Sequence, residues 1–294
     1  MPRVIMIGAV QFSERLALTL HDGPLDLVGI CTTSRPFGSD ALDLTPFATE
    51  LGVDVLDVQD LNDPASLAWL AERSPDVVVC AGWSRLLRDE VLRLPRLGVI
   101  GYHPAALPRN RGRHPIIWTL VLGLPSAGST FFLMDEGADS GPIISQRSIP
   151  VLAQESVASL YARLNEVASE QLAEIAADID RTGGFEIQPQ DQAAATSWRK
   201  RSELDGLVDW RMSAAVVERL VRALGPPYPG AEFHIGPEKI RIVGAEVARG
   251  PLDMEPGRVL AVSGNSATIM TGEGALRIRA ERALEGILSE GDAL

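Results

Sequence analysis

The feature that most constrains the fold is a regular alternation of short apolar runs with helix-forming segments over the first 103 residues. The intervals between the apolar runs carry helical spacing or helix-end signals, such as Asp63-Pro64 at a start and Gly52 at an end. Parallel strands need a crossover of a dozen or more residues, usually a helix, so the alternation predicts a mostly parallel, Rossmann-like three-layer α/β sheet. The expected strands cover residues 3–9, 25–33, 53–58, 76–81 and 98–103.

A change in composition after residue 182 indicates a second domain. An amphipathic helix is predicted over residues 157–181, and the stretch that follows is polar and rich in Gln and Ala, as expected of a linker. Beyond it, Gly, Pro and Asn separate short strand-like runs, which is typical of a small β-barrel of the oligonucleotide/oligosaccharide-binding (OB-like) type. We therefore expect a first domain over residues 1–182, a linker over 183–200 and a C-terminal OB-like domain over 201–294.

Charge and cysteine content narrow the class of protein. The 294 residues carry a net charge of −12, whereas nucleic-acid binding normally requires a basic face that contacts phosphates, so we expect no nucleic-acid partner. Cys31 and Cys80 lie in strand-like apolar runs and are predicted to be buried thiols without a disulfide or a metal site, which favours a cytoplasmic protein. No apolar run in the sequence approaches the roughly 18 residues that a membrane-spanning helix needs.

The first candidate site residue is His103, at the end of the fifth expected strand. Ligands of open α/β sheets bind beyond the carboxyl ends of the strands, so a histidine at this point can face a substrate. The loop that follows contains Pro104, Pro108 and Gly112, which stiffen it and allow one close backbone turn. A packed histidine satisfied by backbone groups is the alternative explanation, and the character of the loop favours the functional one.

The second candidate is the acidic turn at residues 134–141, Met-Asp-Glu-Gly-Ala-Asp-Ser-Gly. A carboxylate within reach of a histidine can orient the ring and stabilise its protonated form. Asp139 lies between two glycines, where the loop can fold inward, and it is therefore the preferred partner of His103. Asp135 and Glu136 are the competing carboxylates, and without the histidine the stretch would be interpreted as an ordinary exposed turn.

A third strand-end loop, Gly82-Trp83-Ser84-Arg85-Leu86-Leu87, follows the fourth expected strand. It offers an aromatic ring and backbone N–H groups to a ligand, and Ser84 can also act as a helix cap. No Gly-x-Gly-x-x-Gly motif follows the first strand, so a nicotinamide or flavin cofactor has no support. The loop is therefore a candidate binding element for another kind of ligand.

Taken together, these motifs resemble the folate-dependent formyltransferase family, which includes methionyl-tRNA formyltransferase, glycinamide ribonucleotide transformylase and the enzymes that formylate nucleotide-linked amino sugars. The family pattern Asn-x-His-x-x-x-Leu-Pro-x-x-x-Gly is matched over residues 101–112 except at its first position. The pattern Asp-x-Gly-x-Asp-[Ser/Thr/Gly]-Gly is matched over residues 135–141. Stretches that begin at Trp198 and Arg219 resemble the linker and C-terminal domain of the tRNA and aminoarabinose-lipid branches, so the resemblance covers nearly the whole chain.

The resemblance implies an enzyme that uses N10-formyltetrahydrofolate as co-substrate and no metal. His103 and Asp139 take the family's catalytic roles, with His103 moving the amine proton and Asp139 supporting the imidazolium. Gly101 takes the position of the family's catalytic asparagine. The co-substrate is expected against Trp83, Arg85, Leu86, Leu87, Gly137, Ala138 and Asp139, and the amine substrate against Tyr102, Pro104, Arg109, Asn110, Arg111, Gly112 and His114.

Gly101 is the position where this chain departs from the family pattern. Side chains alternate along a strand, so residues 101 and 103 face the same way and Tyr102, on the other face, does not replace the missing amide. In the family, the asparagine donates a hydrogen bond to the oxygen of the tetrahedral intermediate. We expect an ordered water, or a donor from the following loop such as Asn110 or His114, in the space that the glycine leaves.

The resemblance implies N-formylation of a primary amine, and the sequence favours a small-molecule acceptor, a nucleotide-linked amino sugar. Methionyl-tRNA is disfavoured by the acidic charge and by residues 34–44, where a tRNA enzyme would need lysines. Hydrolysis of formyltetrahydrofolate is a further alternative, although the regulatory domain usual in those hydrolases has no counterpart in this sequence. A catalytically impaired folate or sugar-nucleotide binding module is the last alternative, because Gly101 lacks an amide side chain.

Overall fold

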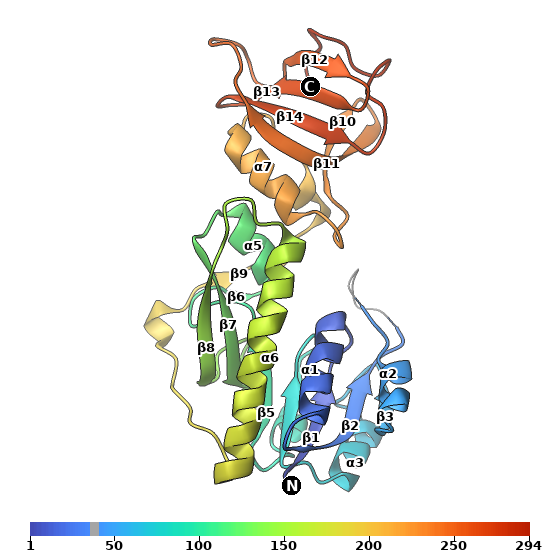
Figure 1. Ribbon diagram of the computed structural model, residues 1–294, viewed down its shortest axis with the longest axis vertical. Coiled ribbons are helices and arrows are strands. Elements are labelled where there is room, and N and C mark those ends of the chain that lie inside the picture. Colours follow the sequence, from blue (N-terminus) through green and yellow to red (C-terminus); the bar gives the residue numbers. More distant parts are fainter. Residues whose placement is uncertain (36–40) are drawn as a thin grey trace. The chain divides into compact units, whose positions relative to one another are not determined.

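Two compact units make up the computed structural model, which describes residues 1–35 and 41–294 (Figure 1). The units interleave along the chain, and residues 183–198, which were expected in a linker, belong to the first of them. The division into folding domains at residues 182 and 200 stays a prediction. Unit 1 contains Met1–Pro115, Ala127–Pro150 and Ala162–Trp198, and unit 2 contains Ile116–Ser126, Val151–Tyr161 and Arg199–Leu294.

The sheet of unit 1 has seven strands in the order β3-β2-β1-β4-β5-β7-β8. The first five in this order pair in parallel, and β7 pairs antiparallel with β5. The mostly parallel, Rossmann-like sheet predicted from the alternation is confirmed. The strands are β1 (Arg3–Ile7), β2 (Asp26–Thr32), β3 (Val55–Asp57), β4 (Val77–Cys80), β5 (Val99–His103), β7 (Ser126–Leu133) and β8 (Ile143–Pro150).

Apolar side chains from alternate strand positions fill both faces of this sheet. On one face, Ile5 and Ile7 belong to a buried cluster with Leu70 of helix α3 and Val91 of helix α4. Helix α1 packs along β1 and β2 and buries Leu16 outside that cluster, so helices cover both faces and give three layers. The helices of the chain are α1 (Gln11–His21), α2 (Thr45–Glu50), α3 (Pro64–Glu72), α4 (Asp89–Leu92), α5 (Pro115–Val121), α6 (Val157–Thr182) and α7 (Ala214–Ala223).

Local hydrogen bonds fix where the helices of unit 1 begin. Asp63 caps α3, because its carboxylate accepts hydrogen bonds from two backbone N–H groups of the first turn at 2.9 Å, and Pro64 occupies the first helical position. In α1, the buried Ser13 hydroxyl donates to the carbonyl oxygen of Ala81 at 2.7 Å. This bond ties the start of α1 to the carboxyl end of β4, at the edge of the sheet where ligands are expected.

Residues 184–198 are fixed to unit 1 by hydrogen bonds, although their polar composition predicted a linker. Gln188 exchanges two backbone hydrogen bonds with Ile143, at 2.7 and 2.8 Å. Strand β9 (Ser197–Trp198) pairs in parallel with β6 (Arg111–Gly112), inside the loop that follows His103. The polar side chains of this segment therefore serve contacts with the loops of the sheet, which composition alone does not reveal.

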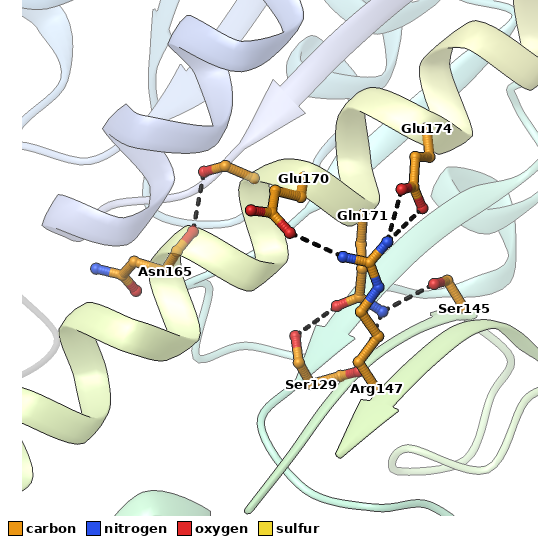
Figure 2. A network of polar contacts seen from close by, with 8 residues as sticks. Ser129, Ser145, Arg147, Asn165, Glu170, Gln171 and Glu174 are labelled. Carbon is orange, nitrogen blue, oxygen red and sulfur yellow. Dashed lines mark hydrogen bonds and ion pairs between the residues drawn. The ribbon is translucent and has the colours of Figure 1, made fainter. Parts of the chain in front are cut away.

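A buried polar network fastens helix α6 to strands β7 and β8 (Figure 2). The amide oxygen of the fully buried Gln171 accepts from the Ser129 hydroxyl at 2.6 Å, and its nitrogen donates to the Ser145 hydroxyl at 2.8 Å. Closer to the surface, Arg147 of β8 pairs with acidic side chains of the same helix. A buried polar group without a partner costs about 1–3 kcal/mol, so these bonds favour one register of α6 on the sheet.

Unit 2 is built on a five-stranded antiparallel sheet in the order β10-β11-β14-β13-β12, with helix α7 packed against β11 and β14. The short C-terminal strands predicted from the turn signals are confirmed. Throughout the part of the chain that the structure describes, no helix combines the length and apolar character needed to cross a bilayer. The strands are β10 (Ala231–Ile235), β11 (Glu238–Ala248), β12 (Val259–Ser263), β13 (Ser266–Met270) and β14 (Ala275–Ala280), and two 3-10 turns cover Gln192–Ala194 and Glu203–Gly206.

Candidate active site

His103 is the last residue of β5, at the edge where the parallel strands present their carboxyl ends. Its side chain is 5% exposed, and Nε2 lies 2.7 Å from the backbone carbonyl oxygen of Asn110. A carbonyl oxygen can only accept, so Nε2 carries a proton and Nδ1 is the ring nitrogen with a lone pair in the neutral tautomer. The loop after β5 therefore sets the orientation of the ring.

Asp139 brings a carboxylate to the second ring nitrogen. Its Oδ2 atom lies 3.5 Å from Nδ1 of His103 and accepts a 2.8 Å hydrogen bond from the backbone N–H of Gly112. Asp139 has φ of 55°, in the left-handed region that Asp tolerates better than most residues. The structure thus brings together the two residues that the sequence proposed as partners.

The two competing carboxylates of the acidic turn have different surroundings. Oδ1 of Asp135 accepts hydrogen bonds from two groups within the turn, at 2.6 and 3.0 Å, and so closes the turn on itself. The side chain of Glu136 is 77% exposed. Of the three carboxylates, Asp139 is the one that lies beside His103.

Two glycines permit the close backbone approaches that this geometry requires. Gly112 has φ of 100°, and a Cβ atom there would lie 2.3 Å from the carbonyl oxygen of Trp198 on β9. A Cβ atom at Gly141 would lie 1.8 Å from the carbonyl oxygen of Leu133. Because both obstacles are backbone atoms, a larger residue at these positions would displace the loop or the turn.

The space beside Gly101 is filled by apolar side chains. A Cβ atom there would lie 2.8 Å from Cζ of Phe132 and 2.8 Å from Cγ of Met134, and Phe132 is buried on the adjacent strand β7. β5 and β7 pair directly and the ring of Phe132 covers the glycine, so the space next to the backbone is apolar, and a water or loop donor in place of the family's amide stays a prediction. Asn110 instead presents its backbone carbonyl oxygen to His103.

A hollow of about 590 Å³ lies next to the acidic turn and is lined by three residues proposed to bind the co-substrate, Arg85, Leu86 and Leu87. Leu86 is 72% exposed and gives this hollow an apolar surface. Trp83 packs against the buried apolar cluster that contains Ile5 and Ile7. It therefore supports the loop and does not line the hollow. Gly137 and Ala138 are exposed on the turn. The remaining lining residues are Asp60, Asn62, Arg88, Asp89, Glu90 and Glu136.

Asn62 holds the shape of this hollow, a role for which the sequence did not single it out. Its amide nitrogen donates to the carbonyl oxygen of Leu86 at 3.0 Å, and its amide oxygen accepts from the backbone N–H of Arg88 at 2.7 Å. The side chain thus fixes the loop on which the proposed folate contacts lie. An asparagine just before a helix cap is typical of a turn, so the sequence carries little signal for this role.

Tyr102 lies apart from the other residues proposed to contact the amine. Its ring packs against Phe12 and Phe131, with ring centroids 4.6 and 5.0 Å away, and its hydroxyl is 3.1 Å from the hydroxyl of Ser129. Burial raises the pKa of the Tyr102 hydroxyl. These contacts are on the face of β5 opposite to His103, so we leave Tyr102 out of the proposed site.

The loop after β5 carries the other residues proposed around the amine. Arg109 is exposed and Pro104 is partly exposed, so both can meet a ligand. Arg111 is buried, and its guanidinium donates to the side chain of Gln190 at 2.6 Å. Arg111 therefore anchors the loop and is not a free substrate contact. His114 ends the loop with φ of 56°.

The two cysteines of unit 1 are not candidate nucleophiles. Cys31 and Cys80 are free and buried, as predicted, and burial raises the pKa of Cys80 to about 12. A buried, protonated thiol is a poor nucleophile. Across residues 1–35 and 41–294, no three His, Cys, Asp or Glu side chains are grouped so that they could hold a metal ion.

Two family profiles match the sequence. The profile described as "Formyl transferase" covers residues 37–176, and the profile described as "Formyl transferase, C-terminal domain" covers residues 201–286. A protein named methionyl-tRNA formyltransferase from Roseiflexus sp. (strain RS-1) is 34% identical over 94% of this chain and 86% of its own length. A protein of the same name from Roseiflexus castenholzii is 33% identical over 93% of this chain and 89% of its own length.

Solved structures share the fold at lower sequence identity. The N-formyltransferase from Helicobacter canadensis, in complex with folinic acid and dTDP-3-aminofucose, aligns with a TM-score of 0.72 and 13% identity over 95% of this chain and 99% of its own. HypX from Aquifex aeolicus, in complex with tetrahydrofolic acid, aligns with a TM-score of 0.64 and 22% identity over 94% of this chain and 43% of its own. At these identities the likeness concerns the fold.

Proposed function

Because the chain belongs to the formyl transferase family, we propose that it transfers a formyl group from N10-formyltetrahydrofolate to the amino group of methionyl-tRNA. Two relatives that bear this activity in their names align over 94% and 93% of the chain. The nucleotide-linked amino sugar favoured by sequence reasoning becomes the second candidate acceptor, because the structures that suggest it share the fold at 13% to 23% identity.

The observation that carries the proposal is the buried His103–Asp139 pair at the carboxyl end of β5. The pair combines a ring nitrogen that can accept a proton with a carboxylate 3.5 Å away, at the edge of the sheet where ligands bind. General acid–base catalysis requires such a group within reach of the reacting atoms. The hollow beside Glu136 of the acidic turn, lined by Arg85, Leu86 and Leu87, offers room for the co-substrate.

The chemistry of formyl transfer matches what this pair can do. The amine nitrogen attacks the formyl carbon, a tetrahedral intermediate forms, and the bond from that carbon to N10 breaks as the amine loses a proton and N10 gains one. His103 accepts the amine proton at Nδ1, while Nε2 keeps its own proton and donates it in a hydrogen bond to the carbonyl oxygen of Asn110. Asp139 stabilises the protonated ring through its negative charge, because its carboxylate lies 3.5 Å from Nδ1.

The charge distribution favours the second candidate acceptor, a nucleotide-linked amino sugar. The chain carries a net charge of −12, whereas tRNA binding draws on many phosphate contacts. Arg109 and Arg113 are exposed on the loop after His103, and two guanidinium groups match the one or two phosphates of a sugar nucleotide. Of the segment 34–44, where lysines would favour tRNA, residues 36–40 lie outside the described residues.

A side-by-side acceptor assay tests the proposal. Purified protein and N10-formyltetrahydrofolate are incubated with methionyl-tRNA, with a tRNA charged with another amino acid, or with a panel of nucleotide-linked amino sugars, and formylated product is measured in each case. We expect formylmethionyl-tRNA and no product with the other charged tRNA. If product forms with an amino sugar and not with methionyl-tRNA, the nucleotide-linked amino sugar replaces methionyl-tRNA as the proposed acceptor.

Two further outcomes of the same assay correspond to the other functions considered. Formate released without any amine would identify a formyltetrahydrofolate hydrolase. Folate binding by calorimetry without turnover of any acceptor would identify a binding module, as the replacement of the family asparagine by Gly101 allows.

The variant His21→Ala serves as a matched control for His103→Ala, because His21 also faces an aspartate but lies on the surface.

A further inference from the structure

Gln190 lies beneath the acidic turn and connects it to the loop that follows His103. The residue is 8% exposed and belongs to the segment that folds back onto unit 1 between Gln188 and β9. Its amide nitrogen donates to the carbonyl oxygens of Asp139 and Gly141, at 2.9 and 2.6 Å. Its amide oxygen accepts from Nε and an Nη atom of Arg111, at 3.2 and 2.6 Å.

This contact set uses the full hydrogen-bonding capacity of a glutamine amide. Such a group has two N–H donors and an oxygen with two lone pairs, and each of the four is engaged by Arg111, Asp139 or Gly141. A carboxylate at this position could still accept from Arg111 but would face two carbonyl oxygens without a proton to donate. A hydrocarbon side chain would leave a buried guanidinium and two carbonyl groups without these partners.

Gln190 joins the two segments that form the hydrogen bond orienting the candidate catalytic carboxylate. Arg111 directly precedes Gly112, whose N–H donates to Oδ2 of Asp139 at 2.8 Å. The carbonyl that accepts from Gln190 belongs to Asp139 itself. One side chain therefore fixes both the donor strand and the acceptor residue of this bond.

The backbone of Asp139 gives a second reason for such support. Its φ of 55° lies in a region that costs a non-glycine residue free energy and persists where the surroundings impose it. The bonds from Gln190 hold the carbonyl groups of Asp139 and Gly141 on both sides of Ser140. They thereby favour the one conformation of the turn in which the carboxylate reaches His103.

We propose that Gln190 is a positioning residue of the formyl-transfer site, which sets the Asp139 carboxylate against His103 by clamping the acidic turn to Arg111. The proposal rests on the proposed function, because it assigns Gln190 a part in the same reaction. Gln190 acts through Asp139 and Arg111, without contacting the reacting atoms. The effect of removing it is therefore expected on the catalytic step, with little change in folate affinity.

Two substitutions and one matched control isolate this role. Gln190→Met keeps the length of the side chain and removes all four hydrogen bonds. Gln190→Glu keeps acceptors for Arg111 and removes the two donors to the turn, so it separates clamping of the turn from anchoring of the arginine, and it provides a second variant if Gln190→Met does not fold. Gln188→Met is the control, because Gln188 is an exposed glutamine that holds Ile143 through its backbone.

The measurements are steady-state kinetics and amide hydrogen exchange. Both Gln190 variants should lose kcat by about tenfold to a hundredfold, the range expected when a catalytic group is misplaced by about 1 Å. KM for the folate should stay within about twofold of wild type, because ground-state binding is kept. The backbone N–H of residue 112 should exchange at least about tenfold faster in the Gln190 variants, because its acceptor on Asp139 is no longer held. Gln188→Met should behave as wild type in both measurements.

Three results would overturn the positioning role: an unchanged kcat in both Gln190 variants, an equal loss in Gln188→Met, or a rise in KM for the folate with kcat kept. The exchange measurement separates this inference from the proposed function. If the wild-type protein formylates no acceptor, the proposed function fails. Hydrogen exchange at residue 112 then decides by itself whether Gln190 clamps the acidic turn. Faster exchange in the Gln190 variants only would support the clamp, and unchanged exchange would refute it.

Discussion

Two His–Asp pairs in unit 1 consist of the same residue types in very different settings. His21 and Asp22 are neighbours in sequence at the end of α1, with Nδ1 3.1 Å from the carboxylate and side chains 38% and 69% exposed. His103 ends strand β5 and Asp139 lies in the acidic turn, their side chains lie 3.5 Å apart, and they are 5% and 20% exposed. The shorter distance belongs to the surface pair, so distance alone does not distinguish a candidate catalytic pair.

The two pairs differ in what holds each member. In the buried pair, Nε2 of His103 meets the carbonyl oxygen of Asn110, and Oδ2 of Asp139 accepts from the N–H of Gly112. These second contacts set the orientation of both groups before a substrate arrives, which is the condition for efficient proton transfer. An exposed pair such as His21–Asp22 is screened by solvent and typically contributes about 0–1 kcal/mol to stability.

The largest contrast is expected from removing each histidine. His103→Ala should lower kcat by about 10²–10⁴-fold, the usual contribution of general acid–base catalysis, while folate binding persists. His21→Ala should leave kcat unchanged, because His21 lies outside the site. Formyl transfer measured under saturating folate compares the two variants. Wild-type turnover by His103→Ala would remove the histidine from the mechanism.

The carboxylates give the next contrast. Asp139→Asn should lower kcat by about tenfold to a hundredfold, because a neutral amide does not stabilise a protonated imidazole. Asp22→Asn should have no effect on turnover. Asp135→Asn should be the milder change within the acidic turn, since the hydrogen bonds to Asp135 close the turn on itself. A greater loss of turnover in Asp135→Asn than in Asp139→Asn would show that the wrong carboxylate has been chosen.

Gly112→Ala should weaken the hydrogen bond from the backbone N–H of residue 112 to Asp139. The carboxylate of the buried pair would then be held less firmly, as in the surface pair. The substitution combines a positive φ, which costs about 1–3 kcal/mol for a non-glycine residue, with a Cβ atom 2.3 Å from the carbonyl oxygen of Trp198. Gly183→Ala is the control, because Gly183 has φ of 78° and no atom within 4 Å of its added Cβ. Denaturant unfolding should show the larger loss of stability for Gly112→Ala. Equal losses would mean that the contact with Trp198 yields without cost.

The smallest change is expected from restoring the family's asparagine beside His103. Gly101→Asn places a side chain against Phe132 and Met134, each with an atom 2.8 Å from the added Cβ, and such overpacking typically costs about 1–3 kcal/mol. We expect lower stability and turnover that is unchanged or lower. A gain in turnover of about tenfold or more would show that the site accepts the amide and that the glycine had impaired it.

Much of unit 1 is predictable from the sequence because its signals are local. Alternating apolar runs identify the parallel strands, and a histidine at a strand end, as His103 is, points to the ligand-binding edge of the sheet. The acidic turn is recognisable by its glycines, and its position beside His103 could be proposed from family motifs.

The supporting contacts could not be predicted, because they join segments that are remote in sequence. Gln190 lies in a polar stretch whose composition indicates a linker, and nothing local shows that its amide serves Asp139 and Arg111. The environment of Gly101 depends on the pairing of β5 with β7, which places the ring of Phe132 over it. A short window of sequence around Gly101 shows neither which strand pairs with β5 nor where the ring of Phe132 lies.

The most direct test of the account is a double-mutant cycle on the buried pair. The kcat/KM of wild type, His103→Ala, Asp139→Asn and the double variant is measured with the same acceptor. If the two residues act as one unit, the double variant should lose about as much as His103→Ala alone, because Asp139 has no imidazolium left to stabilise. Losses that add fully in free energy would show that His103 and Asp139 act independently, and would contradict the account.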